Sequence, residues 1–172
     1  MQITSITFPT LVYTPISDKE HKLAEPRMIT VNMPAGKGYR FLLDKNFVTN
    51  LRSGTDLINP IIPKHGNEMR TYAYIVHDAL YTVHYFSREF TDNLLKAWLT
   101  YADEETRLEI KNEEALPEPD KKYIKLLKSQ ILGSAKIWAI WKTVSWFGKS
   151  AFNEKIKPPY DGNEKRFFME VI

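Results

Sequence analysis

The residues best suited to acid–base chemistry lie in one apolar stretch, residues 73–86, which reads AYIVHDALYTVHYF. This stretch contains the pair His77-Asp78 and a second histidine, His84. An imidazole titrates near neutral pH and can take a proton from water, and a carboxylate can be a metal ligand. The pair therefore fits a site in which His77 is a general base and Asp78 is a metal ligand.

Winding residues 68–86 as an α-helix separates polar from apolar side chains. At about 100° per residue, a narrow stripe collects the residues that can hydrogen-bond: Arg70, Tyr74, His77, Tyr81, His84 and Arg88. Another side collects Val76, Ala79, Leu80 and Val83 as a plain apolar face. Solvated faces favour Glu, Lys and Gln, so the stripe indicates a half-buried cleft. Asp78 lies about a quarter turn away and can flank the same site without meeting His77 face to face.

A further carboxylate, Asp92, lies near the start of the next predicted helix, in FTDNLLKAWL (90–99). On an antiparallel neighbour helix, Asp92 could accept the ring N–H of His77 and fix its tautomer, as carboxylates do for catalytic imidazoles. Helix capping by Asp92 or Thr91 explains the same residue without any catalytic role. Likewise, His77 and Tyr81 could be a hydrogen-bonded pair sealed in the core.

The other ionisable residues of the stripe have simpler explanations. His84 lies two turns from His77, roughly 10 Å along the axis, so the two would not readily share one metal ion. Arg70 and Arg88 are expected to be ion-pair partners, for which the acidic segment 103–120 is the natural source.

The surrounding elements predict an α+β fold in a single domain, residues 1–172. Residues 1–67 are mainly strands and loops, with strand-like runs SITF, RMITVNM and YRFLLD. Residues 53–67 contain two prolines and two glycines and are predicted to be a long ordered loop. Residues 68–150 are helical, and residues 151–172 form a C-terminal tail. We expect a small N-terminal antiparallel sheet packed on about three helices, with the His-Asp motif on an antiparallel helix pair.

The third predicted helix runs from Asp120, a plausible N-cap, to Gly148, a plausible C-cap. Its large aromatic residues are expected to supply core: Trp138, Trp141, Trp146 and Phe147. The tail from Pro158 to Ile172 is predicted to be irregular, and its segment RFFMEVI (166–172) is apolar enough to dock. Any of these aromatic residues that stay exposed would, together with this tail, mark a contact with a second copy of the chain or with a partner.

Composition narrows the function classes. The 172 residues include no cysteine, which excludes disulfides, thiolate metal sites and a cysteine nucleophile. The net charge of +3 makes no strong case for a nucleic-acid or membrane partner, and no nucleic acid is expected. The N-terminus lacks the pattern of a signal peptide, and no run reaches the length of a membrane span, so we expect a soluble chain.

Four segments together resemble a family of phage and prophage proteins of uncharacterised function: TDLINPIIP (55–63), RTYAYIVHDALY (70–81), FTDNLLKAWL (90–99) and AKIWAIWKTVSWFG (135–148). The resemblance covers about residues 28–150. The His-Asp-x-Leu-Tyr pattern matches residues 77–81, whereas TDLINPI departs from the family's Thr-Asp-Gly-Ala-Ser-Ile-Pro. The resemblance implies a virion or tail component, or a protein that contacts a phage or host protein, in the host cytoplasm or the assembled virion.

The same helix resembles the catalytic helix of phospholipase A2 enzymes, especially the disulfide-free forms of parvovirus virions. That resemblance implies His77 as the general base on water, Asp78 as a Ca²⁺ ligand, and Asp92 as the carboxylate that orients His77. Tyr81 would belong to the supporting hydrogen-bond network, and phospholipid would be the substrate. Those enzymes carry a glycine-rich calcium loop, whose pattern neither Gly54–Asp56 nor Gly66-Asn67 reproduces.

Three functions follow from these patterns. The first is a non-enzymatic interaction protein, and the second is a calcium-dependent, phospholipase-like ester hydrolase. The third is a metal-dependent phosphohydrolase, for which His-Asp is a signature doublet but four histidines are a thin supply of ligands. The exposure of His77 to solvent distinguishes the enzymatic functions from the interaction protein. A catalytic base needs a cleft that solvent can reach and a hydrogen-bond partner.

Overall fold

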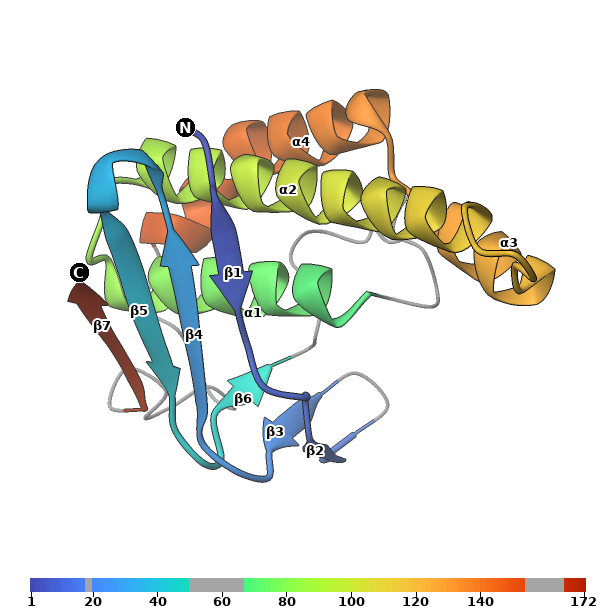
Figure 1. The fold of residues 1–172 in the computed structure, drawn as a ribbon. Helices are drawn as coiled ribbons and strands as arrows, with labels where there is room; N and C mark the ends of the chain where they lie inside the picture. Colours follow the sequence, from blue (N-terminus) through green and yellow to red (C-terminus); the bar gives the residue numbers. More distant parts are fainter. Residues whose placement is uncertain (18–19, 50–66, 154–165) are drawn as a thin grey trace.

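The structure of the chain is a computed structural model that describes residues 1–17, 20–49, 67–153 and 166–172. It confirms the predicted α+β class, with antiparallel sheets packed on helices (Figure 1). The predicted loop 53–67 lies outside the described residues except for Asn67.

The main sheet has four antiparallel strands in the order β1-β4-β5-β7. They are β1 (Ser5–Thr7), β4 (Arg27–Asn32), β5 (Gly38–Leu43) and β7 (Phe167–Val171). In β4, Arg27, Ile29 and Val31 are buried and alternate with more exposed residues, because successive side chains point to opposite faces. Strands β1, β4 and β5 confirm the ones predicted in SITF, RMITVNM and YRFLLD. A 3-10 turn, η1 (Pro34–Gly36), joins β4 to β5.

A second, smaller sheet lies beside the main one. Its order is β2-β3-β6, formed by β2 (Tyr13–Pro15), β3 (His21–Leu23) and β6 (Val48–Thr49). Both sheets are antiparallel throughout.

The described segment of the C-terminal tail, residues 166–172, is not irregular, so that prediction was wrong there. Its residues form β7, the edge strand next to β5, in a register that pairs Leu43 with Phe167. Phe167 is fully buried and stacks on Phe41, with ring centroids 6.0 Å apart. The backbone N–H and C=O groups of β5 need partners on this side, and the tail supplies them. The expected docking of the tail is therefore confirmed, as a strand that completes the sheet.

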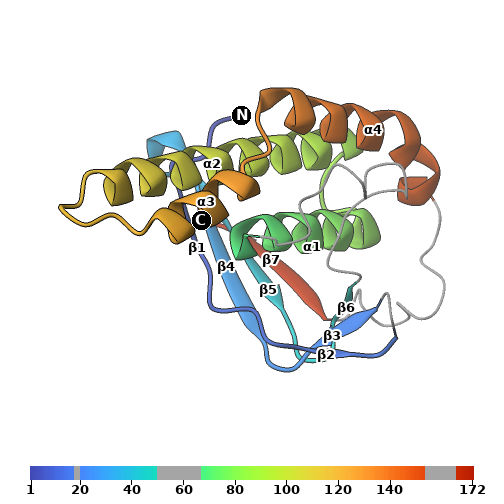
Figure 2. The ribbon, with the colours of Figure 1, turned by 90° about the vertical axis from the view of Figure 1, so that its right-hand side faces the viewer.

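The helix pair of the His-Asp motif follows the prediction closely. Helix α1 (Glu68–Val83) begins at Asn67, whose side chain accepts a hydrogen bond from the backbone N–H of Met69. Helix α2 (Arg88–Glu114) begins at Ser87, whose hydroxyl accepts from the N–H of Phe90. The two helices run antiparallel across one face of the main sheet (Figures 1 and 2).

The single third helix that was predicted is two helices, α3 (Lys121–Gln130) and α4 (Ser134–Asn153), both packed against α2 (Figure 2). Asp120 is confirmed as the N-cap, because its carboxylate accepts from the N–H groups of Lys122 and Tyr123. The chain turns between the helices at Gly133, whose φ of 76° suits glycine. Gly148 is not a C-cap, since α4 continues past it to Asn153.

The core lies between the main sheet and the pair α1 and α2, where Phe41, Tyr72 and Trp98 are among the largest fully buried side chains. The aromatic residues of α4 contribute less to it than predicted. Trp138, Trp146 and Phe147 are 52%, 67% and 55% exposed, and Trp141 is half-buried. The buried side of α4 is aliphatic instead and consists of Ile137, Ile140 and Val144. None of the described helices has the length and apolar character to span a bilayer.

Candidate functional site

Asp92 joins the two helices at the centre of the candidate site. One oxygen of its carboxylate, Oδ1, lies 3.1 Å from His77 Nε2 and accepts a 2.5 Å hydrogen bond from the Tyr81 hydroxyl. The contact predicted between Asp92 and His77 is therefore present. Capping does not explain Asp92 or Thr91, because Ser87 is the N-cap of α2 and both residues are buried in the helix.

This geometry assigns the protons of the site. Because a carboxylate only accepts hydrogen bonds, we assign the ring proton of neutral His77 to Nε2. The other ring nitrogen, Nδ1, then carries the lone pair and lies 3.8 Å from Oδ1 of Asp78. The two side chains are thus closer than their offset around the helix predicted. Tyr81 also packs on the imidazole, with ring centroids 4.3 Å apart.

The charges around His77 favour its protonated form. Burial is the largest single influence on the pKa of His77 and lowers it, but Asp78 and Asp92 together outweigh burial and raise this pKa above its ordinary value. Burial, the hydrogen bond to Asp92 and the charge of Asp92 all raise the pKa of the Tyr81 hydroxyl, which therefore stays protonated as a donor. The arrangement stabilises an imidazolium ion at position 77, which is the state that a general base reaches after taking a proton.

The site is sealed on the Asp92 side and more open on the Asp78 side. The side chains of His77 and Asp92 are 4% and 3% exposed, whereas that of Asp78 is 38% exposed. Of these three side chains, Asp78 is therefore the one that solvent reaches most.

The remaining members of the predicted polar stripe separate from this site. His84 adopts a left-handed conformation just after α1, is exposed and stacks on Phe152, with ring centroids 4.3 Å apart. Arg88 belongs to α2 and donates a 2.5 Å hydrogen bond to the carbonyl of Ser145. The prediction that Arg88 pairs with the acidic segment was therefore wrong. The stripe ends at Tyr81, about two turns earlier than the sequence suggested.

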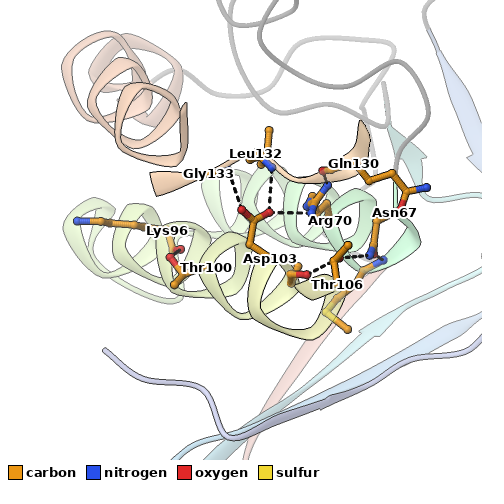
Figure 3. A network of polar contacts seen from close by, with 11 residues as sticks. Asn67, Arg70, Lys96, Thr100, Asp103, Thr106, Gln130, Leu132 and Gly133 are labelled. Carbon is orange, nitrogen blue, oxygen red and sulfur yellow. Dashed lines mark hydrogen bonds and ion pairs between the residues drawn. The ribbon is translucent and has the colours of Figure 1, made fainter. Parts of the chain in front are cut away.

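Arg70 does pair with the acidic segment, as predicted, through a buried 2.7 Å contact with Asp103 (Figure 3). The same carboxylate accepts hydrogen bonds from the N–H groups of Leu132 and Gly133, at 3.1 and 2.7 Å. Arg70 also donates to the carbonyl of Gln130. This network holds the turn between α3 and α4 against α1 and α2, so its role is structural.

The C-terminal part of α4 covers Tyr81, which the sequence did not suggest. The ring of Phe152 meets the ring of Tyr81 edge-on, with centroids 5.1 Å apart. A Cβ atom at Gly148 would come within 2.5 Å of the Tyr81 hydroxyl. The only sequence signal was a glycine in the middle of an aromatic helix, which reads equally well as a helix end.

A metal site is incomplete among the described residues. Within these ranges, no group of three or more His, Asp or Glu side chains is placed to hold an ion. Ca²⁺ takes six to eight oxygen ligands, and no such group of side chains includes Asp78 in the described part of the chain. The candidate loop Gly54–Asp56 lies outside the described residues.

Comparisons with protein-family models, curated proteins and solved structures found no significant match to this chain. The resemblances to the phage family and to phospholipase A2 therefore rest on the residues alone and stay predictions.

Proposed function

We propose that the protein is an ester hydrolase in which His77 is the general base, with phospholipid as the substrate class. The observation that supports this most is the shared hydrogen bonding of Asp92, whose Oδ1 contacts both His77 Nε2 and the Tyr81 hydroxyl. Burial without such partners would leave His77 an ordinary core residue, whereas this arrangement fixes its tautomer and orientation.

In the proposed reaction, Nδ1 of His77 takes a proton from a water molecule on the Asp78 side. The water oxygen forms a bond to the ester carbonyl carbon, and the bond from that carbon to the alcohol oxygen then breaks. The proton on Nδ1 passes to the departing alcohol oxygen, so the products are a carboxylic acid and an alcohol. Asp92 stabilises the intermediate imidazolium, and Tyr81 holds Asp92 in place.

Asp78 is the proposed metal ligand, if the enzyme uses Ca²⁺. A bound Ca²⁺ would supply a positive charge for the ester carbonyl. Because the described residues do not complete such a site, no step above depends on the ion. The proposed role of Asp78 without it is electrostatic, since its carboxylate helps to raise the pKa of His77.

The test is hydrolysis of a soluble short-chain ester and of phospholipid in mixed micelles, with Ca²⁺ and with a chelator. The key variant is His77→Gln, because glutamine can still donate to Asp92 while it removes the basic nitrogen. His84→Gln is the matched control, since His84 is an exposed histidine outside the site. We expect wild type and His84→Gln to be active and His77→Gln to be inactive. Equal rates for all three, or no hydrolysis by folded wild type, would refute the proposal.

A non-enzymatic phage protein, either a virion or tail component or a host-binding protein, is the second candidate. The exposed Trp138, Trp146 and Phe147 favour it, because large exposed aromatic residues mark contact surfaces. In this case the hydrogen bonds of Asp92 would serve only to hold α1 against α2. A folded wild type that hydrolyses neither ester would favour this candidate.

A further inference from the structure

The outward side of α4 carries an unusual combination of aromatic and basic residues. Trp138, Lys142, Trp146 and Lys149 follow one another at spacings of four, four and three, which places them within about 80° of the helix surface. We call these four residues the α4 outer face. Phe147 lies outside this face, about 100° beyond Trp146 around the helix. Both tryptophans are more than half exposed, although the opposite side of α4 already supplies the core.

Lys142 of α4 lies close to the tryptophan rings. The Lys142 ammonium lies 5.9, 4.8 and 5.5 Å from the ring centroids of Trp138, Trp141 and Trp146. From α2, the ammonium of Lys96 lies 4.3 Å from the ring of Trp141. A cation held over a ring keeps its aliphatic stem against apolar surface and its charge at the rim.

Charge selects the kind of partner. Residues 134–153 include Lys136, Lys142 and Lys149 and contain no Asp or Glu, so the helix carries three positive charges and no negative one. A partner must therefore accept large aromatic rings and supply negative charge beside them. The surface of an anionic bilayer does both, because indole rings prefer the headgroup region and lysines reach the phosphates.

We propose that the α4 outer face docks on the surface of an anionic phospholipid bilayer. No helix needs to cross the bilayer for this mode of binding, since the rings would enter only the headgroup region. The amphipathic indoles of Trp138 and Trp146 suit that depth.

The same helix lies against the candidate site. Gly148 sits against the Tyr81 hydroxyl, and Phe152 packs on the Tyr81 ring. The carbonyl of Ser145 accepts a hydrogen bond from Arg88 at the start of α2. Docking through α4 would therefore fix the position of the His77 site relative to the bilayer. This second part, that bilayer phospholipid is the substrate, rests on the proposed function, whereas binding itself does not.

Vesicle binding by His77→Gln protein tests the proposal without any hydrolysis. Vesicles of phosphatidylcholine with phosphatidylglycerol are compared with vesicles of phosphatidylcholine alone, by flotation and by the shift of tryptophan fluorescence. We expect binding to the anionic vesicles that weakens with salt, and at least tenfold less of it after Trp138→Ala with Trp146→Ala. Phe168→Ala is the matched control, because Phe168 is an exposed aromatic residue on β7.

Charge variants sharpen the result. Lys142→Gln with Lys149→Gln should weaken binding to anionic vesicles, whereas Lys121→Gln with Lys122→Gln, on α3, should weaken it much less. Absence of binding, or binding unchanged by the tryptophan and α4 lysine variants, would overturn the proposal. The proposal would also be overturned if the protein bound no vesicles but self-associated, and Trp146→Ala abolished the self-association. The α4 outer face would then contact a second copy of the chain. If vesicles bind as expected but wild type cleaves no soluble ester, only the proposed function fails.

Discussion

Replacing Asp92 by asparagine removes a buried charge while it keeps the shape and the accepting oxygen of the side chain. Both donors, His77 Nε2 and the Tyr81 hydroxyl, converge on Oδ1, which the amide oxygen can replace. Hydrogen bonds to charged groups contribute about 1.5–3 kcal/mol and neutral ones about 0.5–1.5 kcal/mol. Replacing these two charged hydrogen bonds by neutral ones should therefore lower the free energy of unfolding by about 2 kcal/mol.

The pH dependence of stability should change in the same variant. In wild type the pKa of His77 is raised on folding, so protonation stabilises the fold. That contribution is complete below about pH 6.5, the unfolded value, and is lost as the pH rises through the folded pKa. In Asp92→Asn only Asp78 opposes burial, so the loss of stability between pH 6 and pH 9 should shrink or reverse.

Urea unfolding of both proteins at pH 6 and pH 9 measures these effects. Asp78→Asn is the comparison, because it neutralises a carboxylate that is much more exposed and should cost less stability. An Asp92→Asn protein as stable as wild type at pH 6, with the same pH dependence, would refute the account of the site.

Three further changes test neighbouring contacts. Tyr81→Phe removes a buried hydrogen bond and should cost about 1–2 kcal/mol of unfolding free energy, whereas Tyr85→Phe, at an exposed residue, should cost almost nothing in the same urea titration. Gly148→Ala places a Cβ 2.5 Å from the Tyr81 hydroxyl and should cost about 1–3 kcal/mol by overpacking; an unchanged midpoint would show that α4 does not press on Tyr81. Asp103→Ala leaves Arg70 buried without its carboxylate partner and should lower the free energy of unfolding by about 3–5 kcal/mol. Lys128→Ala breaks only an exposed ion pair and should lower it by less than about 1 kcal/mol. Similar losses of stability in the two variants would contradict a structural role for the buried network.

Local patterns were sufficient for the elements that carry the site. The spacing of polar and apolar residues in 68–86 predicted α1, and the apolar run FTDNLLKAWL (90–99) predicted α2. Because a short connection joins these two helices, they were expected to pack antiparallel. The contact between Asp92 and His77 could therefore be predicted from the sequence. Strands β4 and β5 were equally readable, because one face of each is buried and the period of two is clear.

Long-range contacts decided the parts that the sequence did not predict. The break between α3 and α4 depends on Asp103, which accepts the N–H groups of Leu132 and Gly133 from about thirty residues away. Strand β7 exists because β5, far earlier in the chain, offers an unpaired edge. The tryptophans of α4 were assigned to the core because of their size, but the aliphatic side of the helix fills that space. Which apolar side of a helix is buried depends on the surface it packs against and not on the local sequence pattern.

The rate of ester hydrolysis as a function of pH, measured for wild type and His77→Gln, tests the central claim most directly. The account predicts that wild-type activity rises with pH as His77 loses its proton, above about pH 6.5 because Asp78 and Asp92 raise its pKa. It also predicts that His77→Gln is inactive at every pH while it stays folded. A wild type without activity, or a His77→Gln protein with the wild-type profile, would contradict the claim that His77 is a catalytic base.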